Sequence, residues 1–366
     1  MPIDADPPWP NSAIHHLTCA DGLLGTHTAK SSTDAVAAAH QYSGSLGGVG
    51  LCQVAVHLAF ATRRGHTIID RALYVTQEWA GDEERRERAG VPEELVFATK
   101  PELAAAMLTQ ACAAGVRASF FTGDEVYGSR ALRRTCRALG LGYAVAVRSN
   151  HKVTTPGGRL TCTDALALVP AQAWQRMRTG TGSRGARDYD WAMIEVVADD
   201  DPDGRTEAGL SVLLARRHRY TRTVSFFRCW SPTPVPLARL VWVVCRRWKI
   251  EEDFQLCKSA TGLDKGQVIT WTPWHRWSTA ALAAYAFLAV VTALERDAQH
   301  QRDDPDEAGL IPISCPELLR LLRVMILPAP KRDATHALRW SARRRRHQHR
   351  ARACPPRWHD YADTAP

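Results

Sequence analysis

Three charged residues at helical spacing are the strongest chemical signal in this sequence. Arg247, Glu251 and Lys258 lie in a run that neither glycine nor proline interrupts until Gly262. Residues four and seven apart share one face of a helix, so a carboxylate would stand between two cations there. Such a face suits a divalent metal ion and a phosphate group together. The alternative interpretation is a solvated helix surface with ordinary ion pairs.

A second carboxylate follows a short apolar segment. Residues 118–122 are predicted to form a strand, and Asp124 and Glu125 come just past its carboxyl end. In open α/β sheets, ligands bind at this edge. The alternative for Asp124 is a turn or helix-capping residue, which is the commoner role of an aspartate after a strand.

The strings around both acids resemble those of DDE insertion-sequence transposases. The order Arg247, Glu251, Lys258 is similar to their YREK-type signature, although Val244 stands where the tyrosine is expected. The string Thr-Gly-Asp-Glu-Val-Tyr-Gly at 122–128 and the Gln-Tyr-Ser-Gly string at 41–44 also match. The resemblance extends over about residues 29–355 and is to the insertion-sequence family 701 branch of the family 4 superfamily.

This resemblance implies a site and its chemistry. Asp124 and Glu251 would be catalytic carboxylates and metal ligands, and Arg247 and Lys258 would contact DNA phosphates. Two Mg²⁺ or Mn²⁺ ions, roughly 4 Å apart, would activate the nucleophile and stabilise the leaving oxygen during phosphodiester cleavage and strand transfer. The partner would be double-stranded DNA, at element ends and at the target, bound by a homodimer.

The first acid that the resemblance requires is not in its place. It is due near Leu24, where the sequence reads ADGLLGTHTAK, and Asp21 is a weak candidate three residues early with no apolar strand before it. The resemblance therefore implies a late start or a shifted frame upstream of about residue 29. Three functions stay open: an active transposase, a non-catalytic DNA-binding remnant, and a ribonuclease-H-like nuclease.

The elements that must position these residues predict an α/β fold with a ribonuclease-H-like mixed sheet. We expect an irregular N-terminus at 1–29 and the first part of the catalytic domain at 30–150. A mostly β insertion is expected at 151–235, before the glutamate helix. The segment 236–330 is expected to hold that helix, predicted over 236–263, and further helices. A basic tail follows at 331–366.

Charge is concentrated in that tail. The chain has 366 residues, 45% of them hydrophobic, and a formal net charge of +9. From Lys331 onward ten Lys and Arg residues face three Asp, a net +7, and Arg343, Arg344, Arg345 and Arg346 are consecutive. Such a tail indicates a polyanion-binding arm, with a disordered solubilising tail as the alternative.

The cysteines, one long uncharged run and three tryptophans give further information about the chain. The ten cysteines form no C-x-x-C pair, which argues against a zinc ribbon and favours free thiols in a reducing cytosol. The resemblance to transposases implies a cytoplasmic, nucleoid-associated protein. The uncharged run 277–294 predicts a buried core helix, and we expect no membrane partner. Trp271, Trp274 and Trp277 could stack on unpaired bases or pack the start of that helix.

Overall fold

The computed structural model describes residues 15–20, 28–29, 32–43, 47–182, 185–201, 209–266, 268–301, 310–326 and 334–362. Residues 1–316 form one unit and residues 317–366 form a second. The larger unit contains a nine-stranded sheet with the order β11-β12-β13-β14-β8-β7-β1-β5-β6. In chain order its strands are β1 (His16–Ala20), β5 (Ala55–Ala61), β6 (His66–Leu73), β7 (Phe120–Gly123), β8 (Gly142–Val147), β11 (Gln175–Gly182), β12 (Gly185–Glu195), β13 (Leu210–His218) and β14 (Val224–Ser231).

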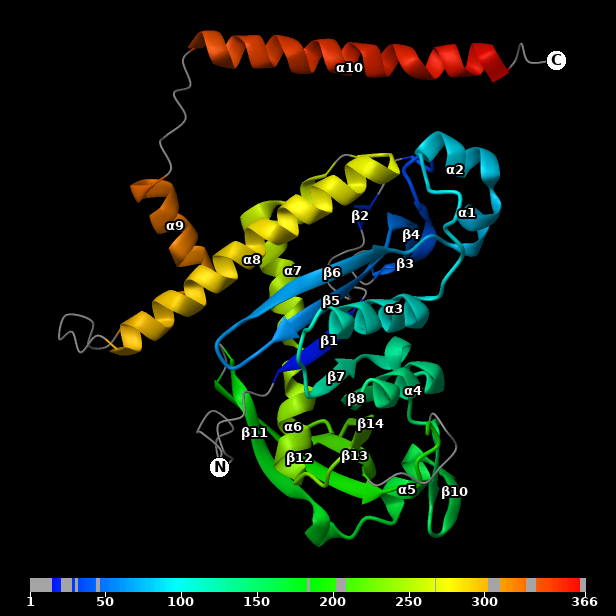
Figure 1. Cartoon of the computed structure of the whole chain (residues 1–366), viewed down its shortest axis with the longest axis vertical. Helices are drawn as coiled ribbons and strands as arrows, with labels where there is room; N and C mark the ends of the chain where they lie inside the picture. The colour runs from blue at the N-terminus through cyan, green and yellow to red at the C-terminus, as the bar shows by residue number, and fades with distance from the viewer. Residues whose placement is uncertain are drawn as a thin grey trace. The chain divides into compact units, whose positions relative to one another are not determined.

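Five of these strands form the ribonuclease-H-like part of the sheet (Figure 1). Strand β5 is antiparallel to both of its neighbours, β6 and β1, while β1, β7 and β8 run parallel. This mixed arrangement, with helices on the sheet, confirms the predicted fold class. The prediction of an irregular segment 1–29 was wrong where the structure describes it, because β1 is an interior strand of the sheet, between β7 and β5, and Thr28–Ala29 form β2.

The predicted β-rich segment adds to the same sheet. Strand β14 pairs antiparallel with β8, and β13, β12 and β11 follow outward in turn. Two short strands, β9 (Lys152–Thr155) and β10 (Gly158–Thr161), form a separate hairpin. Backbone hydrogen bonds therefore join this segment to the ribonuclease-H-like part of the sheet, and the segment does not form a separate β layer.

A small three-stranded sheet accompanies the large one. Its order is β2-β4-β3, with β3 (Ala39–Ser43) and β4 (Gly48–Gln53) paired as an antiparallel hairpin. Tyr42, on β3, is 63% exposed.

Helices cover both faces of the large sheet (Figure 1). One face packs α3 and α4 against Leu17, Val56, Leu58 and Phe121. The other packs α6 against β8, β12, β13 and β14, and packs α7 and α8 against β5 and β6. The helices of this unit are α1 (Gln77–Gly81), α2 (Glu83–Ala89), α3 (Lys100–Ala113), α4 (Arg130–Ala138), α5 (Cys162–Ala167), α6 (Leu237–Arg246), α7 (Lys249–Thr261) and α8 (Trp271–Gln301), with short 3₁₀ turns η1 (Glu125–Tyr127), η2 (Ala171–Ala173) and η3 (Leu263–Lys265).

The predicted glutamate helix is divided in two. Helix α6 ends at Arg246 and α7 begins at Lys249, and the joint is closed by i to i+3 bonds such as Trp248 N to Cys245 O. A 3₁₀ turn of this kind winds the chain more tightly than an α-helix. Gly262 ends α7 in the left-handed conformation, as its lack of a Cβ permits.

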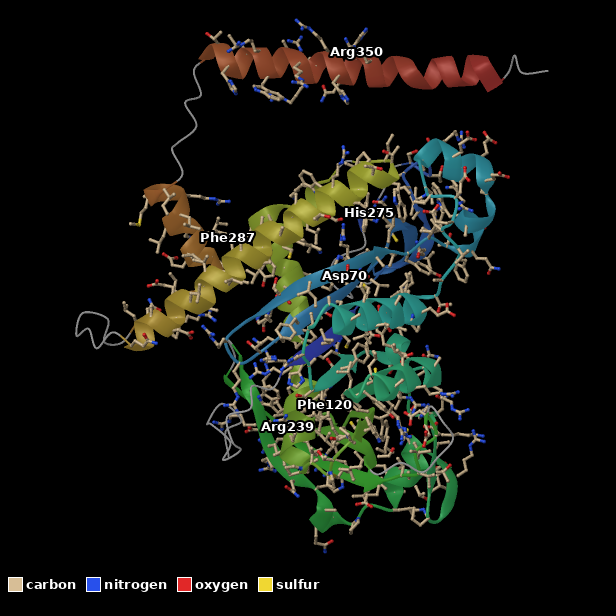
Figure 2. All side chains as sticks on the ribbon, in the orientation of Figure 1. Asp70, Phe120, Arg239, His275, Phe287 and Arg350 are labelled. Carbon is tan, nitrogen blue, oxygen red and sulfur yellow. The ribbon has the colours of Figure 1, made fainter. Side chains whose placement is uncertain are left out.

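Helix α8 packs one face on the core. Leu282, Tyr285 and Leu288 are buried, whereas Phe287 is exposed (Figure 2). Within the described residues, α8 is the one helix long and apolar enough to cross a membrane, over Trp271–Gln299, and helices of protein cores often meet the same test. Trp271 and Trp274 pack against the cluster of Val36, Leu73 and Trp79, which favours the packing interpretation of these tryptophans.

The smaller unit is helical. It contains α10 (Ala334–Ala362) and nearly all of α9 (Cys315–Met325). Arg343, Arg344, Arg345 and Arg346 are exposed, and nitrogen-tipped side chains stand on both sides of α10 (Figure 2). The predicted basic tail is thus a helix over 334–362.

Candidate active site at the carboxyl end of β7

Asp124 stands at a tightly packed turn. Strand β7 is buried throughout, and Asp124 caps the 3₁₀ turn η1 by accepting a hydrogen bond from the backbone N–H of Val126 at 2.9 Å. A Cβ at Gly123 would lie 2.7 Å from Cβ of Tyr127, and a Cβ at Gly128 would lie 2.7 Å from a backbone oxygen of β8. The two glycines of the Thr-Gly-Asp-Glu-Val-Tyr-Gly string therefore permit the close approach that presents Asp124 at the edge of the sheet.

The neighbouring strand is β1. Thr18 and Thr122 share a hydrogen bond at 2.7 Å beneath the edge. The thiol of Cys19 is fully buried, and this burial, with the nearby charge of Asp124 contributing, holds its pKa well above the usual value. The parallel register pairs Cys19 with Gly123 as the last pair of the ladder, so Ala20 and Asp124 are the next residues of the two chain segments. Asp21, the weak candidate for the first acid, lies outside the described residues, although β1 does precede it.

Glu251 is enclosed on α7. Glu251 is 1% exposed, and Nη1 of the Arg247 guanidinium lies 3.9 Å from Oε1 of the Glu251 carboxylate. Helix α7 packs against β1 and β6, so Glu251 sits on a helix that touches the strand next to Asp124. Although Arg247 lies in the 3₁₀ joint between α6 and α7, its side chain still makes the i,i+4 contact with Glu251 that a continuous helix would allow.

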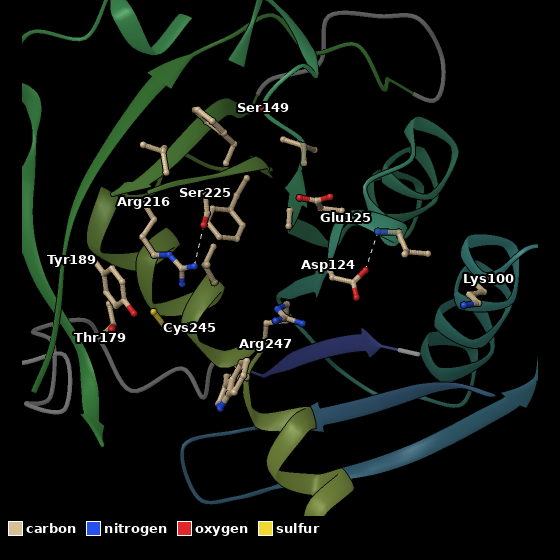
Figure 3. A pocket seen from close by; sticks show the side chains of 18 of the residues that line it. Lys100, Asp124, Glu125, Ser149, Thr179, Tyr189, Arg216, Ser225, Cys245 and Arg247 are labelled. Atoms are coloured by element: carbon tan, nitrogen blue, oxygen red, sulfur yellow. Dashed lines mark hydrogen bonds between the residues drawn. The ribbon is translucent and has the colours of Figure 1, made fainter. Parts of the chain in front are cut away.

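A cavity of about 1070 Å³ joins several of these residues. Asp124 and Glu125 stand on one wall, and Arg247 lies at the α6–α7 joint with its side chain directed toward Asp124 (Figure 3). Glu251 and Lys258 are not among the described residues that line this cavity. Lys258 is half-buried near the far end of α7, and burial lowers its pKa. The structure thus brings Asp124 and Arg247 together, with Glu251 directly behind Arg247.

The other two acids of α7 have a structural role. Asp253 is buried and accepts hydrogen bonds from Nδ1 of His66 and from the hydroxyl of Tyr285, both at 2.6 Å. Glu252 pairs with His66 at 3.4 Å and with Lys249 at 2.8 Å. Burial opposes protonation of His66, but its two carboxylate partners outweigh burial and raise its pKa to about 9. This cluster joins β6, α7 and α8.

The acidic stretch after β12 is also structural. Asp200 is fully buried and pairs with Arg133 at 2.9 Å and with Arg137 at 3.0 Å. Asp199 pairs with Arg133 at 2.7 Å and with Arg228 at 2.9 Å, and these guanidinium groups outweigh its partial burial and hold its pKa well below the usual range. These carboxylates are therefore committed to arginines of α4 and β14.

A metal ion at this site would need a group of suitable ligand atoms among the described residues. Hard divalent cations require several oxygen ligands, supplied by carboxylates and waters. Among these residues no three His, Cys, Asp or Glu side chains are grouped closely enough to hold an ion. Asp124 lies at the carboxyl end of β7 and Glu251 is buried on α7, and no third described carboxylate completes a two-ion site with them.

Cavity residues on the β-rich segment were not predicted. Arg216, Tyr189 and Ser225 line the wall opposite Asp124, and Lys100 and Tyr42 also line the cavity. The sequence carried one signal, the alternation of Val212, Leu214 and Arg216 along a strand, which places the arginine on an otherwise apolar face.

The central part of the chain resembles a known family. Residues 25–191 match the family model described as DDE superfamily endonuclease. The match supports a DDE-type nuclease. It covers less than half of the chain and contains Asp124 but not Glu251.

The comparisons with curated proteins and with solved structures are less informative about this chain. No curated protein matches the chain. A solved structure, the piggyBac transposase synaptic complex with hairpin DNA, aligns over 89% of this chain with 11% identity and a TM-score of 0.34. This chain spans 56% of the length of that transposase chain.

Proposed function

We propose that this chain is a DDE-type DNA transposase of the YREK branch, the insertion-sequence family 701 group, acting by phosphodiester cleavage and strand transfer at element ends. One observation carries the proposal. Asp124 follows β7, which pairs with β1 in a ribonuclease-H-like sheet, and Arg247 lines the same cavity as Asp124. Nη1 of Arg247 lies 3.9 Å from Oε1 of the buried Glu251.

Each group has a role in this proposal. Asp124 and Glu251 would hold Mg²⁺ or Mn²⁺, two ions in a complete site, which would activate the nucleophile and stabilise the leaving oxygen. Arg247 and Lys258 would bind phosphates of double-stranded DNA, and Arg343, Arg344, Arg345 and Arg346 would extend that contact. The protein would act as a homodimer on transposon ends and target DNA, in the cytoplasm at the nucleoid.

A second candidate, a non-catalytic DNA-binding remnant, is favoured by one observation. Ala20, the residue that follows the last pair of the β1–β7 ladder, carries no carboxylate. With only two acids of the site among the described residues, the protein would bind DNA through its cations and cleave it poorly, because the third ligand belongs to the metal site.

One assay separates the candidates. The full chain is incubated with labelled duplex DNA carrying a terminal inverted repeat, in Mg²⁺, in Mn²⁺ and in chelator. A transposase cleaves at the repeat end only with metal, and Asp124→Asn or Glu251→Gln abolishes cleavage, whereas the exposed control Glu93→Gln does not. Equal cleavage by Glu251→Gln would remove Glu251 from the mechanism. Salt-dependent binding without cleavage would identify the remnant, and preferential cleavage of an RNA–DNA hybrid would identify a ribonuclease.

A further inference from the structure

One face of β13 changes character along its length. Val212 and Leu214 are buried under α6, whereas Arg216, two residues further on, lines the cavity. Because side chains on a strand alternate between faces, these three share one face. Val244 and Cys245, at the end of α6, also line the cavity, so Arg216 is the first residue of its row beyond the cover of that helix.

The guanidinium of Arg216 is held in a fixed plane. Its Nη2 donates a hydrogen bond to Oγ of Ser225 at 3.1 Å. Its Cζ lies 5.0 Å from the ring centroid of Tyr189 and 5.8 Å from that of Phe227. A guanidinium has five N–H donors in a rigid fork, and stacking on rings fixes its orientation without using them.

Acidic neighbours do not neutralise this arginine within the described residues. Asp188 and Asp190 of β12 pair instead with Arg178 at 3.3 Å and with Arg217 at 3.4 Å. Arg217 follows Arg216 directly and therefore points to the other face of the sheet, where it stacks on Trp174 at 3.8 Å. Arg216 thus presents a positioned positive charge to the cavity.

The cavity sets this charge opposite the predicted catalytic acid. Figure 3 shows Arg216 directed into the cavity from the wall facing Asp124 and Glu125. Strands β8 and β14 lie between β7 and β13, which makes three strand spacings, or about 14 Å. Tyr42 and Trp248, 63% and 47% exposed, add aromatic surface to the lining. At about 1070 Å³ the cavity lies at the upper end of the size range of small-ligand pockets.

We propose that Arg216 binds a backbone phosphate of a DNA strand that passes through this cavity beside Asp124. A planar guanidinium fork binds phosphate oxygens in pairs, and exposed aromatic rings in a basic groove are suited to nucleic-acid bases. Tyr189, Phe227 and Ser225 are positioning residues for the fork. The inference rests on the proposed function for the identity of the polymer, but phosphate binding at Arg216 requires neither metal nor cleavage.

The test measures binding of the full chain to fluorescent oligonucleotides in chelator, over a series of salt concentrations. One arm uses a single strand and the other a blunt duplex of the same sequence. Arg216→Ala should weaken binding about tenfold, the effect of losing one charge-assisted contact. It should also reduce the salt slope by about 0.7 on the single strand or about 0.9 on the duplex. The arm that shows the change identifies the source of the phosphate.

Control variants make the outcome specific. Arg159→Ala removes the same charge from the exposed β9–β10 hairpin and should leave the affinity and the slope unchanged. Arg216→Gln keeps the side-chain stem over the rings and serves if the alanine variant does not fold, with the same expected loss. Arg216→Lys should recover the slope but only part of the affinity. Wild-type affinity and slope in both Arg216→Ala and Arg216→Gln would overturn the inference, whereas a wild-type chain that binds neither oligonucleotide would overturn the proposed function as well.

Discussion

The guanidinium of Arg247 lies 3.9 Å from the carboxylate of Glu251, which is almost completely buried. The cation lines the cavity and the acid lies behind it. Burying a carboxylate is unfavourable unless a positive group compensates for the lost hydration. The pair therefore couples the stability of α7 to a residue that also faces the proposed substrate.

Removal of this cation should destabilise the fold. We expect Arg247→Ala to lower the free energy of unfolding by about 1–3 kcal/mol, below the value for a fully buried pair because Arg247 is partly exposed. Glu251→Gln should have a smaller effect, and the double variant should recover most of the loss. Urea unfolding at constant pH measures this, with the exposed Arg276→Ala as control. If Arg247→Ala and Arg276→Ala unfold alike, Arg247 does not compensate for the buried acid.

The His66 cluster predicts a pH dependence of stability. Its folded pKa of about 9 lies above the ordinary value of 6.5, so the folded protein binds the proton more tightly. The contribution of protonated His66 is then fully present below pH 6.5 and is lost as the pH rises through 9. The upper limit of the loss is about 3 kcal/mol. Urea unfolding between pH 6 and 9.5 should show this decline, and His66→Gln should flatten it; an equal decline in His66→Gln would assign it elsewhere.

The register of β1 and β7 predicts where a third carboxylate would act. Ala20→Asp should place an acid beside Asp124, at a strand spacing of about 4.8 Å. Without metal the two like charges should repel, so Ala20→Asp should melt at a lower temperature than the uncharged, equally sized Ala20→Asn. Mn²⁺ should raise the melting temperature of the aspartate variant more than that of the asparagine variant. Identical Mn²⁺ responses would refute this placement of the first acid.

Helix α10 predicts a limited salt effect on DNA binding. Arg343, Arg344, Arg345 and Arg346 project about 100° apart around the helix, so a single DNA surface can meet about two of them. Replacing all four by glutamine should therefore reduce the salt slope on duplex DNA by about 1.8, and replacing them by lysine should preserve it. Binding titrations over salt concentration measure the slope. A fall of about 3.6 would mean that all four reach phosphates.

Local signals in the sequence were sufficient for several elements. Gly262 ends α7, and Pro101 stands in the first turn of α3. In each case the residues that determine the structure lie within it. The string around Asp124 likewise carries the two glycines whose close contacts form its turn.

Long-range pairing accounts for what the sequence did not disclose. Strand β1 has only five residues, and two of them, His16 and Thr18, are polar residues that would ordinarily be exposed. Its strand conformation depends on pairing with β5 on one side and β7 on the other. Arg216 reaches the cavity because β13 is paired with β14 and α6 ends beside it. The 3₁₀ joint at Arg247 and Trp248 also lacks a glycine or proline that would mark it.

The single continuous sheet constrains how the cavity can open. Asp124 and Arg216 are attached to strands joined through uninterrupted hydrogen-bonded ladders, which fix the span between those two walls. The wall at Tyr42 belongs to the separate three-stranded sheet and shares no ladder with the large one among the described residues. A shift of the β3–β4 hairpin could therefore change the width of the cavity at Tyr42 without breaking a backbone hydrogen bond of the large sheet. Amide hydrogen exchange at Tyr42 no faster than at Phe227 would argue against such a shift.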